Sequence, residues 1–190
     1  LNAIQKIVWM TISLTDAGKR FNRDWIFRHF SHEFITGRSY AITGPNGSGK
    51  STLLQVIAGA IHLSEGELGY RPPQYDRLLK GAEAEQLYRY IAIAAPYLEL
   101  VEEMTLREFL AFHSTFKPFL KGLTFQEIAS RVGLEAALDK QIRYYSSGMK
   151  QRAKLAQAIF SDVPCIMLDE PCTNLDAAGR HMMEAEVRAH

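Results

Sequence analysis

Residues 44–52 read Gly44-Pro45-Asn46-Gly47-Ser48-Gly49-Lys50-Ser51-Thr52, which fits the pattern G-x-x-x-x-G-K-[ST]. A backbone that wraps a phosphate must bring several N–H groups to one point, and glycine permits the positive φ angles that this requires. In such a loop Lys50 supplies a charge for the β- and γ-phosphates, and the hydroxyl of Ser51 suits Mg²⁺. The pattern therefore predicts a site for a nucleoside triphosphate and Mg²⁺.

The sequence on either side agrees with such a loop. The run Ser39–Thr43 predicts a strand before it, and residues 50–60 predict a helix after it, with Leu53, Leu54 and Ile57 on one face. The N-terminal end of this helix would point at the phosphates, where its dipole favours an anion. The expected order of strand, loop and helix is thus the one that the motif needs.

Composition and charge narrow the class of protein. The 190 residues are 47% hydrophobic and 23% charged, which is typical of one globular domain. A net charge of +1 gives no field that favours nucleic acid, so we expect no nucleic-acid partner. The apolar runs are too short to span a bilayer, and no signal peptide is recognisable, so we expect a cytoplasmic protein. Cys165 and Cys172 lack zinc-site neighbours and are expected to be reduced thiols in or near the core.

Short apolar runs predict strands in two parts of the chain. Met10–Leu14 and Trp25–Phe34 have β-like patterns, which, with Ser39–Thr43, predict a strand-rich N-terminal part. Residues 66–75 have the composition of a loop. The unbroken run Val163–Leu168 is typical of a strand buried on both faces of a parallel sheet.

The middle of the chain has helical signals. Thr105 with Glu108, and Thr124 with Glu127, have the spacing of capping boxes, and each precedes apolar residues at helical intervals. Gly133 is suited to end the second of these helices. We therefore expect mainly helices between residues 97 and 157.

Two carboxylates follow the strand predicted at residues 163–168. Ligands of open α/β sheets bind beyond the carboxyl ends of the strands, so Asp169 is placed to meet the Mg²⁺ held by Ser51. Glu170 is then free to orient or deprotonate the water that attacks the γ-phosphate. A polar turn that merely follows a strand is the alternative reading of this pair.

A second helix start lies between the loop and the carboxylates. Residues 144–152 read Tyr-Tyr-Ser-Ser-Gly-Met-Lys-Gln-Arg, and an amphipathic helix follows, with Ser146 or Ser147 as its N-cap.

In this order and spacing the motifs resemble those of the ATP-binding cassette (ABC) family, over the chain from about Met10 onward. Residues 44–52 are similar to its Walker A motif and residues 165–170 to its Walker B motif. The signature motif is matched by Tyr145-Ser146-Ser147-Gly148-Met149, and the D-loop by Thr173-Asn174-Leu175-Asp176. Phe21 falls where the family stacks an aromatic ring on adenine; Trp25 is a competitor, and packing within a strand is an equal alternative for Phe21.

The resemblance implies an α/β fold with a P-loop NTPase (RecA-like) core, an N-terminal antiparallel β subdomain and an inserted α-helical subdomain. We expect one cassette domain over residues 1–190. Residues 1–96 and 158–190 would form the β subdomain and the P-loop core, and residues 97–157 the helical subdomain that carries the signature.

The resemblance also implies an ATPase. Two such domains, in a homodimer or a heterodimer, would pack head to tail with ATP between the Walker A motif of one and the signature of the other. In a transporter they would power translocation through separate transmembrane permease subunits, at the inner face of the cell membrane. A soluble cassette ATPase, similar to those of iron–sulfur assembly or those associated with ribosomes, is the alternative. A binding module without NTPase activity is a third, less favoured reading.

The chain departs from the family pattern at three places. Tyr145, Ser147 and Met149 replace the usual residues of the signature, while Ser146 and Gly148 are kept to contact the γ-phosphate. No glutamine lies at residues 94–97, where the glutamine of the Q-loop is expected. Either Glu99 or Glu102 takes its place, or the metal is coupled to the transporter in a different way. The chain ends before the expected switch histidine, and neither His181 nor His190 is expected to replace it. We therefore expect a C-terminally truncated cassette that binds nucleotide better than it hydrolyses it.

Overall fold

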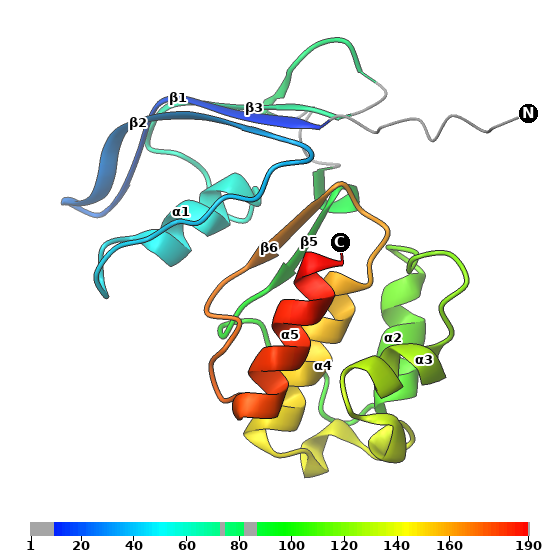
Figure 1. Ribbon diagram of the computed structural model, residues 1–190. Helices are drawn as coiled ribbons and strands as arrows, with labels where there is room; N and C mark the ends of the chain where they lie inside the picture. Colours follow the sequence, from blue (N-terminus) through cyan, green and yellow to red (C-terminus); the bar gives the residue numbers. More distant parts are fainter. Residues whose placement is uncertain (1–9, 73–74, 82–86, 190) are drawn as a thin grey trace, which may run out of the picture. The chain divides into compact units, whose positions relative to one another are not determined.

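The computed structural model of the chain describes residues 10–72, 75–81 and 87–189 (Figure 1). The residues group into two units, Leu1–Ile91 and Ala92–His190. The predicted phosphate-binding loop, residues 44–52, belongs to the first unit, and the two carboxylates with the predicted signature and D-loop belong to the second. The division into residues 1–96 with 158–190 and residues 97–157 remains a prediction.

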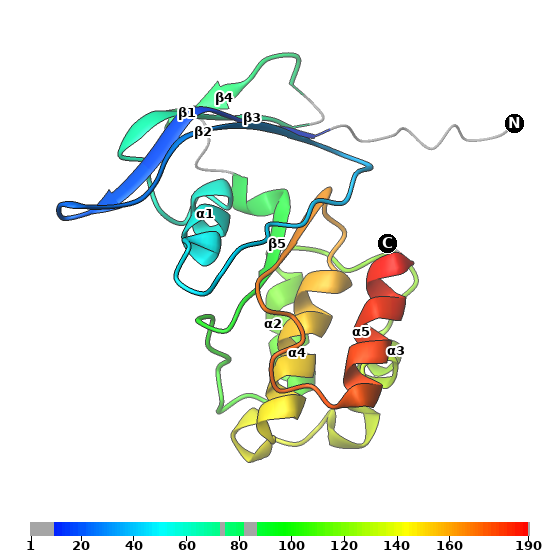
Figure 2. The same cartoon turned by 60° about the vertical axis from the view of Figure 1, so that its left-hand side comes forward.

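The first unit contains a four-stranded antiparallel sheet. Its strands are arranged in the order β2-β1-β3-β4, with bounds β1 Thr11–Phe21, β2 Asp24–Ile35, β3 Glu65–Arg71 and β4 Leu79–Lys80. The turn from β1 to β2 is Asn22-Arg23, and Asn22 has a φ of 54°, which asparagine tolerates better than most residues. The antiparallel strands predicted near the N-terminus are thus confirmed (Figures 1 and 2).

One helix packs on this sheet. Helix α1 spans Lys50–Ile57 and is shorter than predicted; Leu53, Val56 and Ile57 are its buried side chains. The buried hydroxyl of Tyr70, on β3, donates a hydrogen bond to the Ile57 carbonyl at 3.1 Å. This bond satisfies a carbonyl in the last turn of the helix, and it attaches the end of α1 to the sheet.

Two predictions for the first unit are wrong. Residues 39–43 form no strand, because neither sheet of the described residues offers them a pairing partner. Residues 66–71 belong to β3 and not to a loop. Gly66 has a φ of 78°, and a Cβ there would lie 2.2 Å from the Asp16 carbonyl oxygen, so this glycine allows a close approach of two strands.

The second unit combines two short strands with four α-helices. The strands β5 (Ile91–Ala94) and β6 (Cys165–Leu168) pair with each other. The helices are α2 (Leu106–Ser114), α3 (Phe125–Arg131), α4 (Ser147–Ile159) and α5 (Ala177–Arg188), with 3₁₀ turns η2 at Glu135–Ala137 and η3 at Ile142–Tyr144. Strand β6 is shorter than predicted, and only Met167 of it is fully buried, because the pair of strands does not extend into a wider parallel sheet among the described residues.

Both predicted capping boxes are present. The hydroxyl of Thr105 accepts from the Glu108 N–H while the Glu108 carboxylate accepts from the Thr105 N–H, and Thr124 with Glu127 repeats the pattern. Helix α3 ends at a Schellman motif around Gly133, where the Leu134 N–H donates to the Ala129 carbonyl at 2.7 Å. The sequence signals for these helix ends are thus confirmed.

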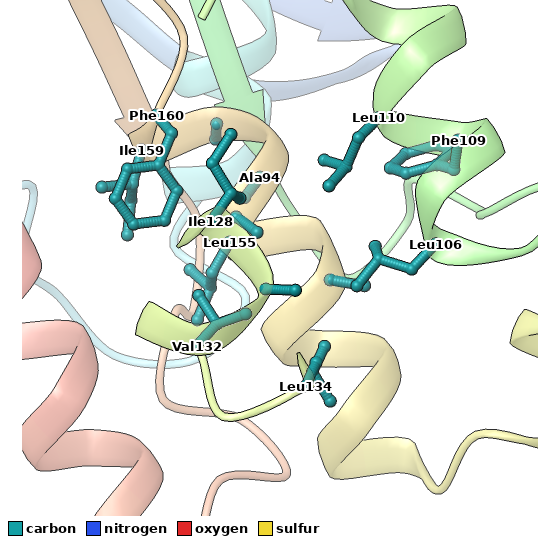
Figure 3. Packing of buried hydrophobic residues seen from close by; sticks show 14 of the residues in the cluster. Ala94, Leu106, Phe109, Leu110, Ile128, Val132, Leu134, Leu155, Ile159 and Phe160 are labelled. Carbon is teal, nitrogen blue, oxygen red and sulfur yellow. The ribbon is translucent and has the colours of Figure 1, made fainter. Parts of the chain in front are cut away.

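The core of the second unit lies between its helices and strands (Figure 3). Its fully buried large side chains come from α2, α3, α4 and the segments next to them: Leu106, Leu110, Ile128, Val132, Leu138, Ile142, Leu155, Ile159 and Phe160. Cys165 is half-buried, and burial raises the pKa of its thiol to about 11, whereas Cys172, expected near the core, is exposed. No helix of the described residues has both the length and the apolar character that crossing a bilayer requires.

A histidine is buried at the end of α2. The His113 Nε2 and the Ser161 Oγ lie 2.9 Å apart, and Ser161 donates to the Gln157 carbonyl at 2.7 Å. Because the Ser161 proton is used in that bond, Nε2–H of a neutral His113 is the donor to Ser161. Burial, with a smaller contribution from Lys117, lowers the pKa of His113 from 6.5 to about 4.

The buried histidine predicts a loss of stability in acid. The unfolded chain takes up a proton on His113 near pH 6.5 and the folded chain only near pH 4, so the contribution is complete above pH 6.5 and falls as the pH decreases toward 4. Between pH 7 and pH 5 the free energy of unfolding should fall by about 2 kcal/mol more in the unsubstituted chain than in His113→Gln. Urea denaturation at both pH values measures this difference. Equal losses in the two proteins would contradict it, and His181→Gln, on the exposed face of α5, is the matched control.

Candidate nucleotide-binding site

The phosphate-binding loop leads directly into the N-terminus of α1. Gly49 is the N-cap, with a φ of 88° and no side chain to accept a hydrogen bond, and no acidic residue lies in the first turn. The first helical bond runs from the Leu53 N–H to the Gly49 carbonyl at 2.8 Å. The N–H groups of Lys50, Ser51 and Thr52 precede it and therefore point out of the helix end, as anion binding requires.

Lys50 folds back over the loop. Its ammonium donates to the carbonyls of Gly44 and Pro45 at 2.9 and 2.8 Å. Both acceptors are neutral, and within the described residues no carboxylate pairs with this lysine. The loop thus carries a positioned positive charge that no carboxylate of the described residues neutralises.

Two glycines are required by the shape of the loop. Gly47 and Gly49 have φ angles of 80° and 88°, in the region that favours glycine. A Cβ on Gly49 would also lie 2.5 Å from Cγ2 of Ile26, on β2. The loop is therefore held against the sheet of the first unit at a distance that only glycine permits.

Two aromatic residues lie at the β1–β2 hairpin. Phe21 is 48% exposed, with the Lys19 ammonium 5.0 Å from its ring centroid. Trp25 is 37% exposed, and the guanidinium of Arg28 stands 4.2 Å from its ring centroid. Phe21 is therefore not packed in the interior of its unit and keeps more free surface than Trp25.

The two carboxylates at the end of β6 have different surroundings. Asp169 is 8% exposed, and its N–H donates to the Ala94 carbonyl at 2.9 Å, which places it beside the end of β5. Its carboxylate has no hydrogen-bond partner among the described residues. Glu170 is exposed, has a φ of 45°, and accepts a hydrogen bond from the Thr173 hydroxyl at 3.2 Å. A non-glycine residue in this conformation is strained, and such strain is typical of functional sites.

Ser146 is the N-cap of α4, which decides between the two predicted caps. Its hydroxyl accepts from the Met149 N–H at 3.2 Å. Ser147 and Gly148 occupy the first turn, and no acidic residue lies there. The predicted signature residues thus gather at one helix end.

The first turns of α4 are attached to the D-loop. A Cβ on Gly148 would lie 2.9 Å from the carbonyl oxygen of Asn174. The side chain of Gln151 donates to the Pro171 carbonyl at 3.1 Å, and that of Arg152 to Asp176 at 2.8 Å. Asp176 also caps α5 by accepting from the Gly179 N–H at 2.7 Å, and these two partners lower the pKa of its carboxyl, the Gly179 bond more than Arg152. The predicted signature and D-loop are therefore in contact.

Sequence reasoning missed several residues of this contact. Gln151 and Arg152 follow the predicted signature, residues 145–149, and the sequence pattern assigns them no role. Their i+20 and i+24 partners lie in another element, so helical spacing gives no sign of the pairing. The one available signal is Gln151 itself, a polar residue on the buried side of an amphipathic helix.

The sequence offers two histidines near its end, neither of which is expected to replace the switch histidine of the family. His181 is exposed on α5, as expected for a surface residue of that helix, and His190 lies outside the described residues. Ser51 and Asp169 belong to different units, and their meeting remains a prediction.

The loop, its lysine and the uncapped helix define a P-loop of the kind that binds nucleotides. The family model described as "ABC transporter" matches residues 27–173. The chain is 32% identical to the sn-glycerol-3-phosphate import ATP-binding protein UgpC of Rhizobium meliloti, over 94% of this chain and 50% of the relative. It is 30% identical to the cytochrome c biogenesis ATP-binding export protein CcmA of Agrobacterium fabrum, over 95% of this chain and 84% of the relative.

A solved structure has the same fold. The chain aligns with the "ATP binding subunit of ABC transporter" with a TM-score of 0.77 and 23% identity, over 94% of this chain and 73% of the other. The chain belongs to the ABC transporter family. It spans about half the length of several of the curated relatives that it matches.

The close approach at Gly148 gives a prediction about stability. Alanine has the higher helix propensity, by roughly 1 kcal/mol, yet its Cβ would overlap the backbone of Asn174. We expect Gly148→Ala to lower the free energy of unfolding by about 1–3 kcal/mol, as overpacking does. Ser147→Ala, one residue away and exposed, is the control and should change it by less than about 0.5 kcal/mol. Thermal and urea denaturation measure both; a stabilised Gly148→Ala would show that the contact with Asn174 is absent.

Proposed function

We propose that the chain is the ATP-binding and ATP-hydrolysing subunit of an ABC transporter. The observation that carries the proposal is the P-loop at the uncapped N-terminus of α1, in a chain of the ABC transporter family. The names of two relatives, one an import and one an export ATP-binding protein, favour a transporter over a soluble cassette ATPase.

The residues of the loop suit a triphosphate with Mg²⁺. The free N–H groups of residues 50–52 and the Lys50 ammonium suit phosphate oxygens. The Ser51 hydroxyl and the carboxylate of Asp169, which has no hydrogen-bond partner among the described residues, are hard oxygen ligands, which Mg²⁺ prefers. The bound metal would neutralise charge that develops on the phosphate oxygens. Phe21, exposed at the end of β1, would stack on the adenine.

Glu170 would orient the attacking water and accept its proton. Its carboxylate is exposed and is held by the Thr173 hydroxyl, and the loop that follows is attached to α4. A general base of this kind contributes about 10²–10⁴-fold to a rate.

The signature would act on the nucleotide of a second cassette. The N-terminus of α4, with Ser146, Ser147, Gly148 and Met149, would receive the γ-phosphate held by the partner's loop. Met149 brings no polar side chain, so the contact would rest on Ser146 and on backbone N–H groups. ATP would join the two cassettes head to tail and its hydrolysis would release them, and Asp176 would keep the D-loop in place at that interface.

Permease subunits would receive this motion at the membrane. The chain would lie at the inner face of the membrane, with the segment from Tyr97 to Glu108 as the docking region for a short helix of the permease. Copurification of the full-length protein with a membrane protein would support this role, whereas recovery with ribosomes or with assembly proteins would contradict it.

Two substitutions test the proposed chemistry. In the full-length protein, Lys50→Ala should weaken ATP binding, because it removes the charge over the loop. Glu170→Gln should keep ATP binding, lower the rate of hydrolysis at least about 100-fold and accumulate an ATP-bound dimer, because the base is lost and the phosphate contacts are kept.

Equilibrium binding of ATP, phosphate release and sedimentation measure these effects. Glu184→Gln, on the exposed face of α5, is the control for Glu170→Gln. Unchanged hydrolysis in Glu170→Gln would remove the role of Glu170, and a chain that fails to bind Mg-ATP would contradict the proposed function as a whole.

A further inference from the structure

The segment that follows β5 is bound to the residues just before the signature. The Ile142 N–H donates to the Met104 carbonyl and the Arg143 N–H to the Glu102 carbonyl, both at 2.9 Å. The side chain of Gln141 donates to the Glu103 carbonyl at 3.0 Å. Residues 102–104 and 141–143 thus form a short ladder of two backbone bonds and one side-chain bond inside the second unit.

An ion pair extends this ladder to the signature helix itself. The Lys150 ammonium bonds to the Glu102 carboxylate, and both side chains are partly exposed, at 29% and 48%. Lys150 lies one turn after Ser146, and its N–H donates to the Ser146 carbonyl at 2.9 Å. The lysine and the cap serine therefore share one face of α4.

The position of Lys150 gives its charge an effect on the helix end. Side chains of a helix lean toward its N-terminus, so a lysine in the second turn carries its ammonium back toward the first. There it adds to the positive end of the helix dipole, and the first turn of α4 contains no acidic residue to offset it. Glu102, from the segment after β5, is the carboxylate that neutralises it.

Stability alone gives little reason for this pair. Partly exposed ion pairs contribute little to folding, and the ladder already joins the two segments. The effect of the pair is local: by neutralising Lys150, Glu102 lowers the positive electrostatic potential at the N-terminus of α4.

We propose that Glu102 is a positioning residue that acts through Lys150 on the affinity of the signature for the partner's ATP. The inference rests on the proposed function, since it concerns the phosphate that the signature would receive across the dimer. It also differs from the expectation that Glu102 replaces the missing glutamine beside the metal of its own chain. Because the Glu102 carboxylate binds Lys150, a movement of the segment after β5 that displaces Glu102 changes the electrostatic potential at the signature.

The test is a double-mutant cycle on ATP-driven dimerisation. The midpoint ATP concentration is measured by sedimentation or light scattering without Mg²⁺, so that hydrolysis does not consume the nucleotide. Glu102→Gln frees the Lys150 charge and should lower the midpoint by about two- to fivefold, whereas Lys150→Met removes a charge that Glu102 already neutralises and should leave the midpoint close to that of the unsubstituted chain. In the Lys150→Met background, Glu102→Gln should change nothing further.

Two more measurements separate this electrostatic role from a structural one. The effect of Glu102→Gln should shrink as the salt concentration rises, because the charges are partly exposed, and a packing defect would not respond in this way. Glu135→Gln, an exposed carboxylate in η2, is the matched control and should leave the midpoint unchanged.

Three outcomes would overturn the inference. An unchanged or raised midpoint in Glu102→Gln, or the same effect of Glu102→Gln with and without Lys150, would overturn it while the proposed function stands. A chain that binds ATP but remains a monomer at all ATP concentrations would remove the head-to-tail part of the proposed function, and the inference with it.

Discussion

The N-terminus of every α-helix leaves backbone N–H groups that need acceptors, and this constraint organises the molecule. In the described residues, α2, α3, α4 and α5 each have a side-chain oxygen as cap, from Thr105, Thr124, Ser146 and Asp176. Helix α1 has Gly49 in that place and no acidic residue in its first turn. The helix that has no acceptor of its own is thus the one that follows the phosphate-binding loop.

Helix α4 contacts the other segments of its unit for which we predict a function. One side of its first turns contacts the D-loop through Gly148, Gln151 and Arg152, and Lys150 reaches Glu102 in the segment after β5. An anion bound at this helix end would therefore affect two neighbouring segments: the loop that carries Glu170 and the segment proposed to meet the permease. The arrangement gives the signature a physical route to both.

Patterns over a few neighbouring residues predicted much of the fold, but they could not predict contacts between residues that are far apart in the sequence. The capping boxes and the turn at Gly133 were predicted because each depends on a few neighbouring residues. The strand expected at residues 39–43 fails because a strand also needs a partner, which no local pattern specifies. Motif order gives the assignment of the loop and the signature, which stays a prediction, whereas the pair Glu102–Lys150 depends on how two separate segments pack.

The central claim is that the N–H groups at the start of α1 are kept for phosphate. Hydrogen–deuterium exchange of the full-length protein, with and without Mg-ATP, measures them most directly. We expect ATP to slow exchange in a peptide covering residues 47–52, and a peptide over the capped start of α3, at residues 124–128, to exchange equally in both states. Unchanged exchange at residues 47–52 in the presence of saturating ATP would contradict the account.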